Sequence, residues 1–258
     1  MNASRPLEGL GIVITRPRAA AEPLARRLER EGARPFVFPA LAIEALPPSP
    51  VLDAALALLA QSRLAIFVSA NAVEHGLAHA RRHGPWPKRV RVAAIGDATA
   101  QALRNSGFRD VISPPERHDS EALLALEPLK SVDGERVVIF RGQGGREALK
   151  ETLEARGALV TYAECYRRMC PAADAAPLLQ AWSRGEVQAV NVLSRETLEN
   201  FMTLVGAQGE AMATRTTLVV PHEAVGAHPA ARRFARMIVS HPGNDGLVKS
   251  LGALRIPT

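Results

Sequence analysis

Short apolar runs alternate with longer amphipathic stretches along the whole chain. Each run is three to five residues long and almost continuously apolar, which is typical of parallel strands covered by helices on both faces. The predicted strands are Ile12–Thr15, Pro35–Phe38, Ala65–Val68, Val92–Ile95, Asp110–Ile112, Val137–Phe140, Leu159–Tyr162, Ala189–Leu193, Thr217–Val220 and Met237–Val239. The alternation predicts an α/β protein with doubly wound, mostly parallel sheets.

Helix boundaries carry recognisable residues. The stretch Ala19–Glu31 has the spacing of an amphipathic helix, and Gly32 follows it as a left-handed stop. Gly157 has the same place after a later stretch. Ser49 and Pro50 are typical of an N-cap and a first helical turn, so they predict a helix that begins there.

The chain repeats itself with a shift of 125 residues, so that Arg16 aligns with Arg141 and Ser69 with Ser194. Between residues 12 and 33, nine of 22 aligned positions are identical. A repeat of this length has the size of a domain. The sequence therefore predicts two copies of one five-stranded fold, and a cleft between similar domains is the first place to expect a site.

The net charge of +6 does not by itself indicate nucleic acid. Most basic residues are mixed with acidic ones, which is typical of solvated helix faces. The one basic cluster, His79–Arg91, is interrupted by Gly84, Pro85 and Pro87, and aromatic residues make up only 4% of the chain. With too few rings to stack bases and no known motif, we expect no nucleic-acid partner.

The apolar stretches and the cysteines bear on the location of the protein. The longest apolar stretch, Ala54–Ala60, is far too short to span a bilayer, and the first residues are polar. Cys165 and Cys170 fit no zinc or disulfide framework and are expected to be reduced thiols. We therefore expect a cytoplasmic protein with no membrane partner, and a monomer, since no exposed apolar stripe demands a second chain.

The residues that follow the strands favour an anionic ligand. Ligands of doubly wound sheets bind at the carboxyl ends of the strands, where helices begin with free N–H groups. Small and hydroxyl residues gather there, and Arg16 and Arg141 add bidentate donors at matching places. The alternative, that Ser and Gly residues only cap helices and permit turns, covers about half of them.

Motifs for cofactors and metals are incomplete. The segment from Gly142 has Glu147 where a dinucleotide fingerprint needs its third glycine, and no P-loop follows. His75, His79 and His83 recur every four residues, but without a carboxylate partner they are better explained as solvent-facing or helix-end residues than as a metal site. We expect neither a cofactor nor a metal.

Six segments, in order and across almost the whole chain, resemble uroporphyrinogen-III synthase. They are VITRP, FVSANAV, AIGDATAQAL, SEALL, VVIFRGQGGREALKETLEARGALV and CYRR. The resemblance implies an enzyme of tetrapyrrole synthesis without cofactor or metal. It would convert linear hydroxymethylbilane to uroporphyrinogen III, losing water and inverting the last pyrrole ring.

The resemblance also implies that the halves exchange strands. One discontinuous domain would comprise residues 1–38 and 172–258, the other 45–163, with a two-stranded linker of about 39–44 and 164–171. Periodicity alone would be satisfied equally well by two domains packed in tandem.

The resemblance places the site on matching residues of this chain. Tyr166, in CYRR, would donate a proton to the departing hydroxyl, although a tyrosine that only packs in the linker would fit as well. The implied substrate-binding residues are Arg16, Ser69, Ala70, Asn71, Gly96, Thr99, Arg141, Gly142, Gly145, Arg146 and Ser194.

One segment departs from the family pattern. Val220–Ala230 places Ala224 opposite Thr99, where the family often repeats a hydroxyl-bearing turn. This departure puts substrate contacts from that turn in doubt. The alternative to the enzyme is a non-catalytic, two-domain binding or regulatory protein for an anionic, tetrapyrrole-like ligand.

Overall fold

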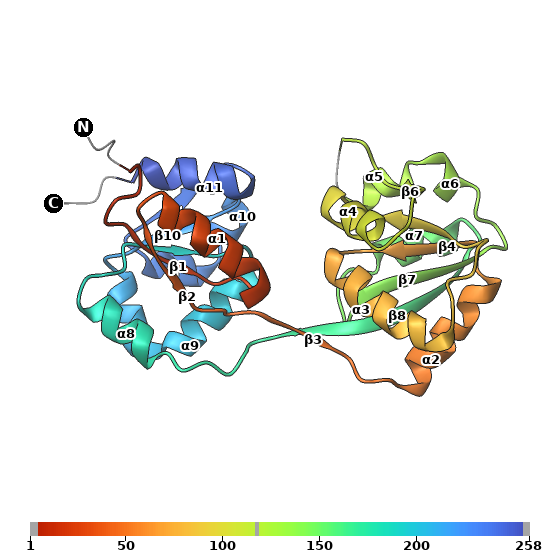
Figure 1. Cartoon of the computed structure of the whole chain (residues 1–258), viewed down its shortest axis with the longest axis horizontal. Helices are drawn as coiled ribbons and strands as arrows, with labels where there is room; N and C mark the ends of the chain where they lie inside the picture. Colours follow the sequence, from red (N-terminus) through yellow and green to blue (C-terminus); the bar gives the residue numbers. More distant parts are fainter. Residues whose placement is uncertain (1–4, 117–118, 255–258) are drawn as a thin grey trace. The chain divides into compact units, whose positions relative to one another are not determined.

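A computed structural model describes residues 5–116 and 119–254. The chain divides into two compact units, Met1–Ala42 together with Met169–Thr258, and Ile43–Arg168 (Figure 1). We call them unit 1 and unit 2. The outermost residues of the predicted discontinuous domain, 1–4 and 255–258, lie outside the described residues.

Unit 1 contains a parallel sheet in the order β11-β10-β9-β1-β2. Its strands are β1 (Gly11–Ile14), β2 (Arg34–Val37), β9 (Ala189–Asn191), β10 (Thr217–Val220) and β11 (Arg236–Val239). The helices α1 (Arg18–Arg30) and α11 (Gly243–Gly252) pack with one face, and α8 (Ala176–Ser183) and α9 (Arg195–Ala213) with the other. Two short helices, α10 (Glu223–Gly226) and η3 (Pro229–Arg233), follow β10.

Unit 2 contains a six-stranded sheet in the order β3-β8-β7-β4-β5-β6. Its strands are β3 (Ala42–Ala45), β4 (Leu64–Phe67), β5 (Arg91–Ala94), β6 (Val111–Ile112), β7 (Arg136–Gly142) and β8 (Leu159–Met169). One face packs with α2 (Pro50–Ala57), η1 (Leu58–Gln61), α3 (Ala70–Ala80) and α4 (Asp97–Asn105). The opposite face packs with α5 (Ser120–Leu124), α6 (Glu127–Lys130) and α7 (Ala148–Ala155). Both sheets are therefore doubly wound, and the predicted fold class is confirmed.

All ten predicted strands are present, but the second sheet has six strands where five were expected. The additional strand is β3, which the resemblance implied as one strand of the two-stranded linker rather than as a strand of the second sheet. It is held by β8, since the Leu46 N–H donates to the Cys165 carbonyl at 3.1 Å and Arg167 pairs with Glu44 at 2.7 Å. The expectation was wrong because these contacts depend on a partner more than a hundred residues away.

The predicted helix boundaries follow local backbone chemistry. Gly32 and Gly157 adopt positive φ values of 96° and 84°, the left-handed conformation that ends a helix. The Ser49 hydroxyl accepts from the Leu52 N–H at 3.2 Å and caps α2, which begins at Pro50. Both predictions are confirmed.

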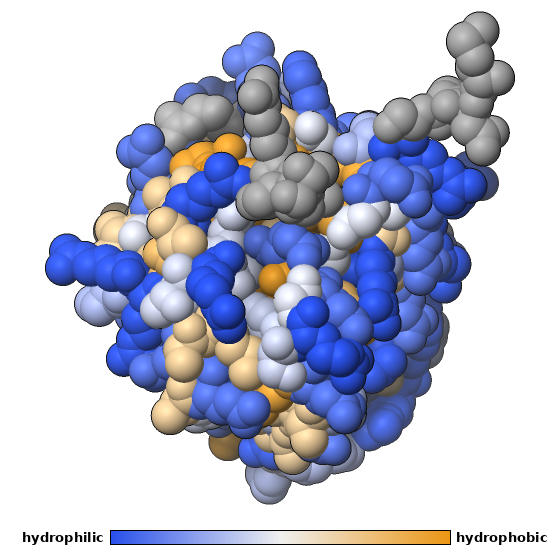
Figure 2. Space-filling model, turned by 90° about the vertical axis from the view of Figure 1, so that its left-hand side faces the viewer, coloured by the Kyte–Doolittle hydropathy of each residue, from blue (hydrophilic) through white to orange (hydrophobic). Residues whose placement is uncertain are grey.

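Polar side chains cover most of the face seen in Figure 2, where hydrophobic residues occur in small, separate groups. In the part of the chain that the structure describes, no helix is long and apolar enough to cross a membrane.

Candidate functional site

The carboxyl ends of β7, β4 and β5 lie side by side in unit 2. The register pairs Phe67 of β4 with Phe140 of β7 and with Ala94 of β5. Ser69 and Gly96, the N-caps of α3 and α4, follow β4 and β5 by two residues, and Gly142 is the last residue of β7. Three predicted site residues therefore start from the same edge of the sheet.

Tyr166 of β8 joins Ser69 and Gly142. Its side chain is buried, and its hydroxyl lies 2.9 Å from the Ser69 Oγ. A Cβ at Gly142 would lie 2.7 Å from the Tyr166 ring, so only glycine lets the ring occupy this position. The backbone of Tyr166 is also fixed, since its carbonyl accepts from the Gln143 N–H at 2.7 Å.

Ser69 is held from the other side by its helix. Its Oγ accepts from the Ala72 N–H at 3.1 Å, which satisfies one of the free donors of α3. The Ser69 hydroxyl hydrogen therefore remains available to donate to the Tyr166 oxygen.

Arg141 organises the loop that follows β7. Its guanidinium is buried and donates from Nη1 to the Glu147 carboxylate at 2.9 Å and from Nε to the Gly142 carbonyl at 3.2 Å, with a further bond to the Gly144 carbonyl. It also stacks over the Tyr162 ring, with Cζ 4.3 Å from the ring centre. These bonds hold the Arg141 side chain against the loop that follows β7.

Tyr162 and Glu147 complete this arrangement and had no signal in the sequence. The Tyr162 hydroxyl donates to the Glu147 carboxylate at 2.7 Å. This hydrogen bond, together with the Arg141 guanidinium, lowers the pKa of the Glu147 carboxyl. Burial, followed by the bond to Glu147, raises the pKa of the Tyr162 phenol.

A hollow of about 540 Å³ opens between this loop, α5 and β8. Five of the predicted site residues line it, namely Arg141, Gly142, Gly145, Arg146 and Tyr166. Arg146 is exposed, and within residues 5–116 and 119–254 its guanidinium has no hydrogen bond or ion pair. The hollow is thus suited to anions at Arg146 and at the exposed backbone of the loop.

The other predicted residues of unit 2 lie beside this hollow without lining it. Ala70 and Asn71 form the first turn of α3, and Gly96 caps α4. Thr99 is buried within the first turn of α4.

Arg16 and Ser194 hold the matching positions in unit 1. Ser194 caps α9, and its Oγ accepts from the Thr197 N–H at 3.1 Å. Arg16 donates from Nη1 to the Asn244 side chain at 2.8 Å, but its buried Nε has no hydrogen-bond partner. Burial lowers the pKa of the Arg16 guanidinium.

Asn191 is a buried polar residue that the sequence pattern did not single out as part of a site. It lies at the end of β9, paired in register with Ile14 of β1, and is 1% exposed. Its Nδ2 donates to the Val219 carbonyl at 3.2 Å, while its Oδ1 is buried without a partner. An amide inside the apolar run Ala189–Leu193 was the available signal.

Comparison with known proteins decides the family. The family model described as uroporphyrinogen-III synthase HemD matches residues 22–249. The chain belongs to the uroporphyrinogen-III synthase family. It is 41% identical over 197 residues to the uroporphyrinogen-III synthase of Salmonella typhimurium and 36% identical over 197 residues to that of Escherichia coli. Each match covers 76% of this chain and 80% of the relative.

Solved structures of the same family share the fold. A uroporphyrinogen-III synthetase from Helicobacter pylori superposes with a TM-score of 0.61 at 12% identity, covering 95% of this chain and 99% of that chain. A mutant uroporphyrinogen III synthase from Thermus thermophilus gives a TM-score of 0.56 at 22% identity, covering 93% of this chain and 97% of the other.

His75 and His79 of α3, and His83 in the short η2 turn (Arg81–His83) that follows it, have separate environments in this family member. The His75 ring lies 5.8 Å from the Tyr166 ring, and the His83 imidazole contacts the Asp53 carboxylate at 3.0 Å. His79 is buried rather than solvent-facing, and burial lowers its pKa. Among the described residues, no group of three His, Cys, Asp or Glu could hold a metal ion.

The segment that departs from the family pattern forms a short turn after β10. It contains α10 and the start of η3, and the Ala224 carbonyl accepts from the Arg195 Nε at 2.8 Å. Ala224 thus contributes a backbone contact, whereas Thr99 brings a hydroxyl to the corresponding turn of unit 2.

Proposed function

We propose that this chain is a uroporphyrinogen-III synthase that cyclises linear hydroxymethylbilane, with loss of water and inversion of the last pyrrole ring. Family membership supports the reaction, and the cluster of Tyr166, Ser69 and Gly142 supports its place in unit 2. A protein that binds an anion without turnover is the weaker alternative, because the chain matches 80% of the length of both relatives, which are named as synthases.

The substrate is a flexible polyanion, with carboxylates on each pyrrole ring. Arg146 would bind one carboxylate in the hollow beside Tyr166. The Gly145 N–H would bind another, since the N–H groups of Gln143 and Gly144 already donate to Tyr166 and Glu164. In unit 1, the Arg16 guanidinium and the N-cap turn at Ser194 would bind carboxylates in the same way. Ala70, Asn71, Gly96 and Thr99 belong to helix starts whose backbone donors suit such groups.

Arg141 would be a positioning residue in this scheme. Its guanidinium already bonds Glu147 and two carbonyls of its loop, so it fixes the loop that presents Gly145 and Arg146. The substrate would meet the loop rather than the buried guanidinium.

Tyr166 would assist the loss of water. If Ser69 donates to the Tyr166 oxygen, the phenol proton points away and is free for the departing hydroxyl. The terminal C–O bond breaks with electron density supplied by the pyrrole, and the hydroxyl takes the Tyr166 proton. Water departs, and a protonated azafulvene remains beside the Tyr166 phenolate. The proton lost when the last ring regains aromaticity returns to Tyr166.

Inversion of the last pyrrole ring would depend on how the protein holds the bound substrate. The azafulvene carbon is attacked by the substituted carbon of the last ring, which forms a spiro intermediate that reopens and closes with that ring inverted. Because the free substrate can close directly without inversion, the protein must bind the inverting path more tightly. Distributed carboxylate contacts are suited to that task.

Incubation with freshly prepared hydroxymethylbilane tests the function. The protein, treated with chelator and free of nucleotide, is expected to yield mainly the type III isomer after oxidation and chromatographic separation. Formation of the type I isomer alone, at the rate without protein, would contradict the synthase and favour the binding protein.

We further propose that the enzyme acts in the cytoplasm as a monomer, with units 1 and 2 as its two domains and no nucleic-acid partner. Light scattering during size-exclusion chromatography should give the mass of one chain, 27.7 kDa. A mass of two chains would contradict the monomer.

A further inference from the structure

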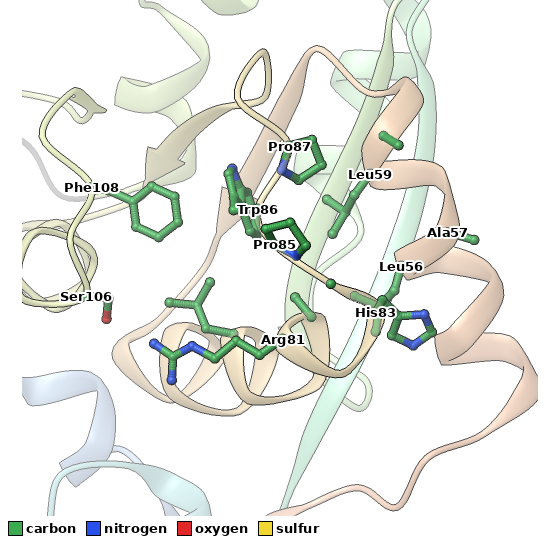
Figure 3. A pocket seen from close by; sticks show the side chains of 14 residues that line it. Leu56, Ala57, Leu59, Arg81, His83, Pro85, Trp86, Pro87, Ser106 and Phe108 are labelled. Atoms are coloured by element: carbon green, nitrogen blue, oxygen red, sulfur yellow. The ribbon is translucent and has the colours of Figure 1, made fainter.

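Unit 2 has a second hollow, of about 440 Å³, at the edge of the sheet where β4 and β5 begin (Figure 3). It lies between α2 with η1, the C-terminal end of α3, the loop Gly84–Pro87, and the turn after α4. Ser69 is the N-cap of α3, whereas this hollow meets the opposite end of the same helix. The two sites are therefore distinct.

The walls of this hollow are apolar and aromatic. Leu56, Leu59 and Leu77 line one part of it. Trp86 and Phe108 form another, packed edge to face with ring centres 5.1 Å apart. A hollow of this size with such walls has the properties of a small-molecule site, for which volumes of about 300–1,000 Å³ are usual.

The aromatic wall is fixed before any ligand arrives. The Trp86 indole donates to the Val90 carbonyl at 3.2 Å, so its polar atom is already satisfied. Pro85 and Pro87 restrict the backbone on both sides of Trp86. A rigid wall lowers the entropic cost of binding.

Arg81 gives the hollow its charge. Figure 3 shows its side chain extending along the hollow toward Ser106 and Phe108. Across residues 5–116 and 119–254, the Arg81 guanidinium has no hydrogen bond or ion pair, while the neighbouring His83 is paired with Asp53. A positive charge without a counter-charge, beside aromatic and aliphatic walls, selects an anion with an apolar body.

We propose that this hollow, which we call the Trp86 pocket, binds an apolar organic anion: an aromatic body lies against Trp86 and Phe108, and its carboxylate or sulfonate pairs with Arg81. The ligand class differs from the flexible polyanion of the proposed reaction, because most of the lining side chains are apolar or aromatic and, among the described residues, Arg81 is the one unpaired cation that lines the pocket.

Two fluorescent probes with the same rings separate charge from apolar contact. Anilinonaphthalene sulfonate carries the anion, and N-phenylnaphthylamine lacks it. Arg81→Gln is expected to weaken binding of the sulfonate about tenfold and to leave the neutral probe unchanged. Arg82→Gln, the adjacent exposed arginine outside the lining, is the matched control and should change neither. Equal affinity of the sulfonate for the wild type and Arg81→Gln would overturn the proposal.

Two further variants locate the probe. Ala60 is exposed and lines the pocket, so Ala60→Trp should obstruct it and abolish binding of both probes. In Trp86→Phe, probe emission driven by tryptophan excitation should fall, while directly excited emission persists. Binding of both probes that survives unchanged in Ala60→Trp would place them elsewhere and contradict the proposal.

Discussion

The Tyr166 hydroxyl lies 2.9 Å from the Ser69 Oγ, although 97 residues separate them in the chain. Each partner is fixed independently: Ser69 caps α3, and the Tyr166 ring fills the space left by the missing side chain of Gly142. A hydroxyl held in this way has a defined direction, which is what a proton donor needs.

Tyr166→Phe tests whether that hydroxyl acts as an acid. General acid assistance is worth about 10²–10⁴-fold, and because the pyrrole itself expels the hydroxyl we expect a loss of about 100-fold or less in kcat. The type III isomer should persist. Steady-state kinetics and isomer analysis measure both quantities. A kcat loss of more than about a thousandfold with KM unchanged would make Tyr166 the principal acid. A shift toward the type I isomer would instead contradict inversion by distributed contacts.

Gly142→Ala tests the same cluster through packing. The new methyl would lie 2.7 Å from two carbons of the Tyr166 ring, so the ring must move and the bond to Ser69 must lengthen. We expect kcat to fall at least as far as in Tyr166→Phe, with a loss of stability of about 1–3 kcal/mol. Gly252→Ala, where the nearest atom is 3.9 Å away, is the control. If Gly142→Ala lowers kcat further in the Tyr166→Phe background, the glycine acts by a route other than the phenol.

The strands of this fold could be predicted because their apolar runs are a local signal, and the same is true of the stops at Gly32 and Gly157. Periodicity did not predict β3, because its pairing depends on the distant β8, and only the family resemblance implied a strand in that linker. Periodicity also could not predict which strands share a sheet, and only the family resemblance implied the exchange of strands between the halves.

The repeat predicted strand-end positions for Arg16 and Arg141 but not their environments. In unit 1 the helix begins at Arg18, which aligns with Gln143, whereas in unit 2 it begins only at Ala148, five residues later (148 − 143). Gly144 and Gly145, with positive φ values of 72° and 110°, let the intervening loop turn back over Arg141. Alanines stand at the aligned positions of unit 1, so Arg16 has no such loop and keeps an unpartnered Nε.

Arg146 and Arg141 should therefore respond differently to truncation. Arg146→Ala removes an exposed guanidinium without protein partners in the described chain, so we expect kcat/KM to fall about tenfold at unchanged Tm. Arg141→Ala should lower kcat/KM and also destabilise the fold by about 1–3 kcal/mol, because it removes the bonds that hold the loop. Kinetics and thermal unfolding of both variants make the comparison. An unchanged Tm for Arg141→Ala would contradict its role in positioning the loop.

The Glu147 carboxylate should make the loop sensitive to acid. Its pKa in the folded protein is lowered from the ordinary value of 4.5, so its stabilising contribution is complete above about that pH and is lost as the pH falls through the lower folded value. The Tm of the wild type should exceed that of Glu147→Gln at neutral pH, and the difference should vanish on acidification below the folded pKa. Glu151→Gln, on the following helix, is the control. A difference in Tm that does not depend on pH would show that the charge of Glu147 is not what holds Arg141.

Asn191 offers a test in unit 1 in which stability and activity are expected to move apart. Its Oδ1 is buried without a partner, an arrangement that costs free energy. In Asn191→Leu the Val219 carbonyl would still accept from the Val192 N–H at 3.0 Å, so this carbonyl keeps a hydrogen bond. Replacing the amide by an apolar side chain of similar size should therefore leave the free energy of unfolding unchanged or raise it.

Activity should respond differently if bound substrate donates to the Asn191 Oδ1, because KM should then rise in Asn191→Leu. Asn191→Asp should not restore KM, since a buried carboxylate beside bound carboxylates is unfavourable. Chemical denaturation and steady-state kinetics on the same preparations decide the matter. A more stable variant with unchanged KM would show that the amide has no part in binding.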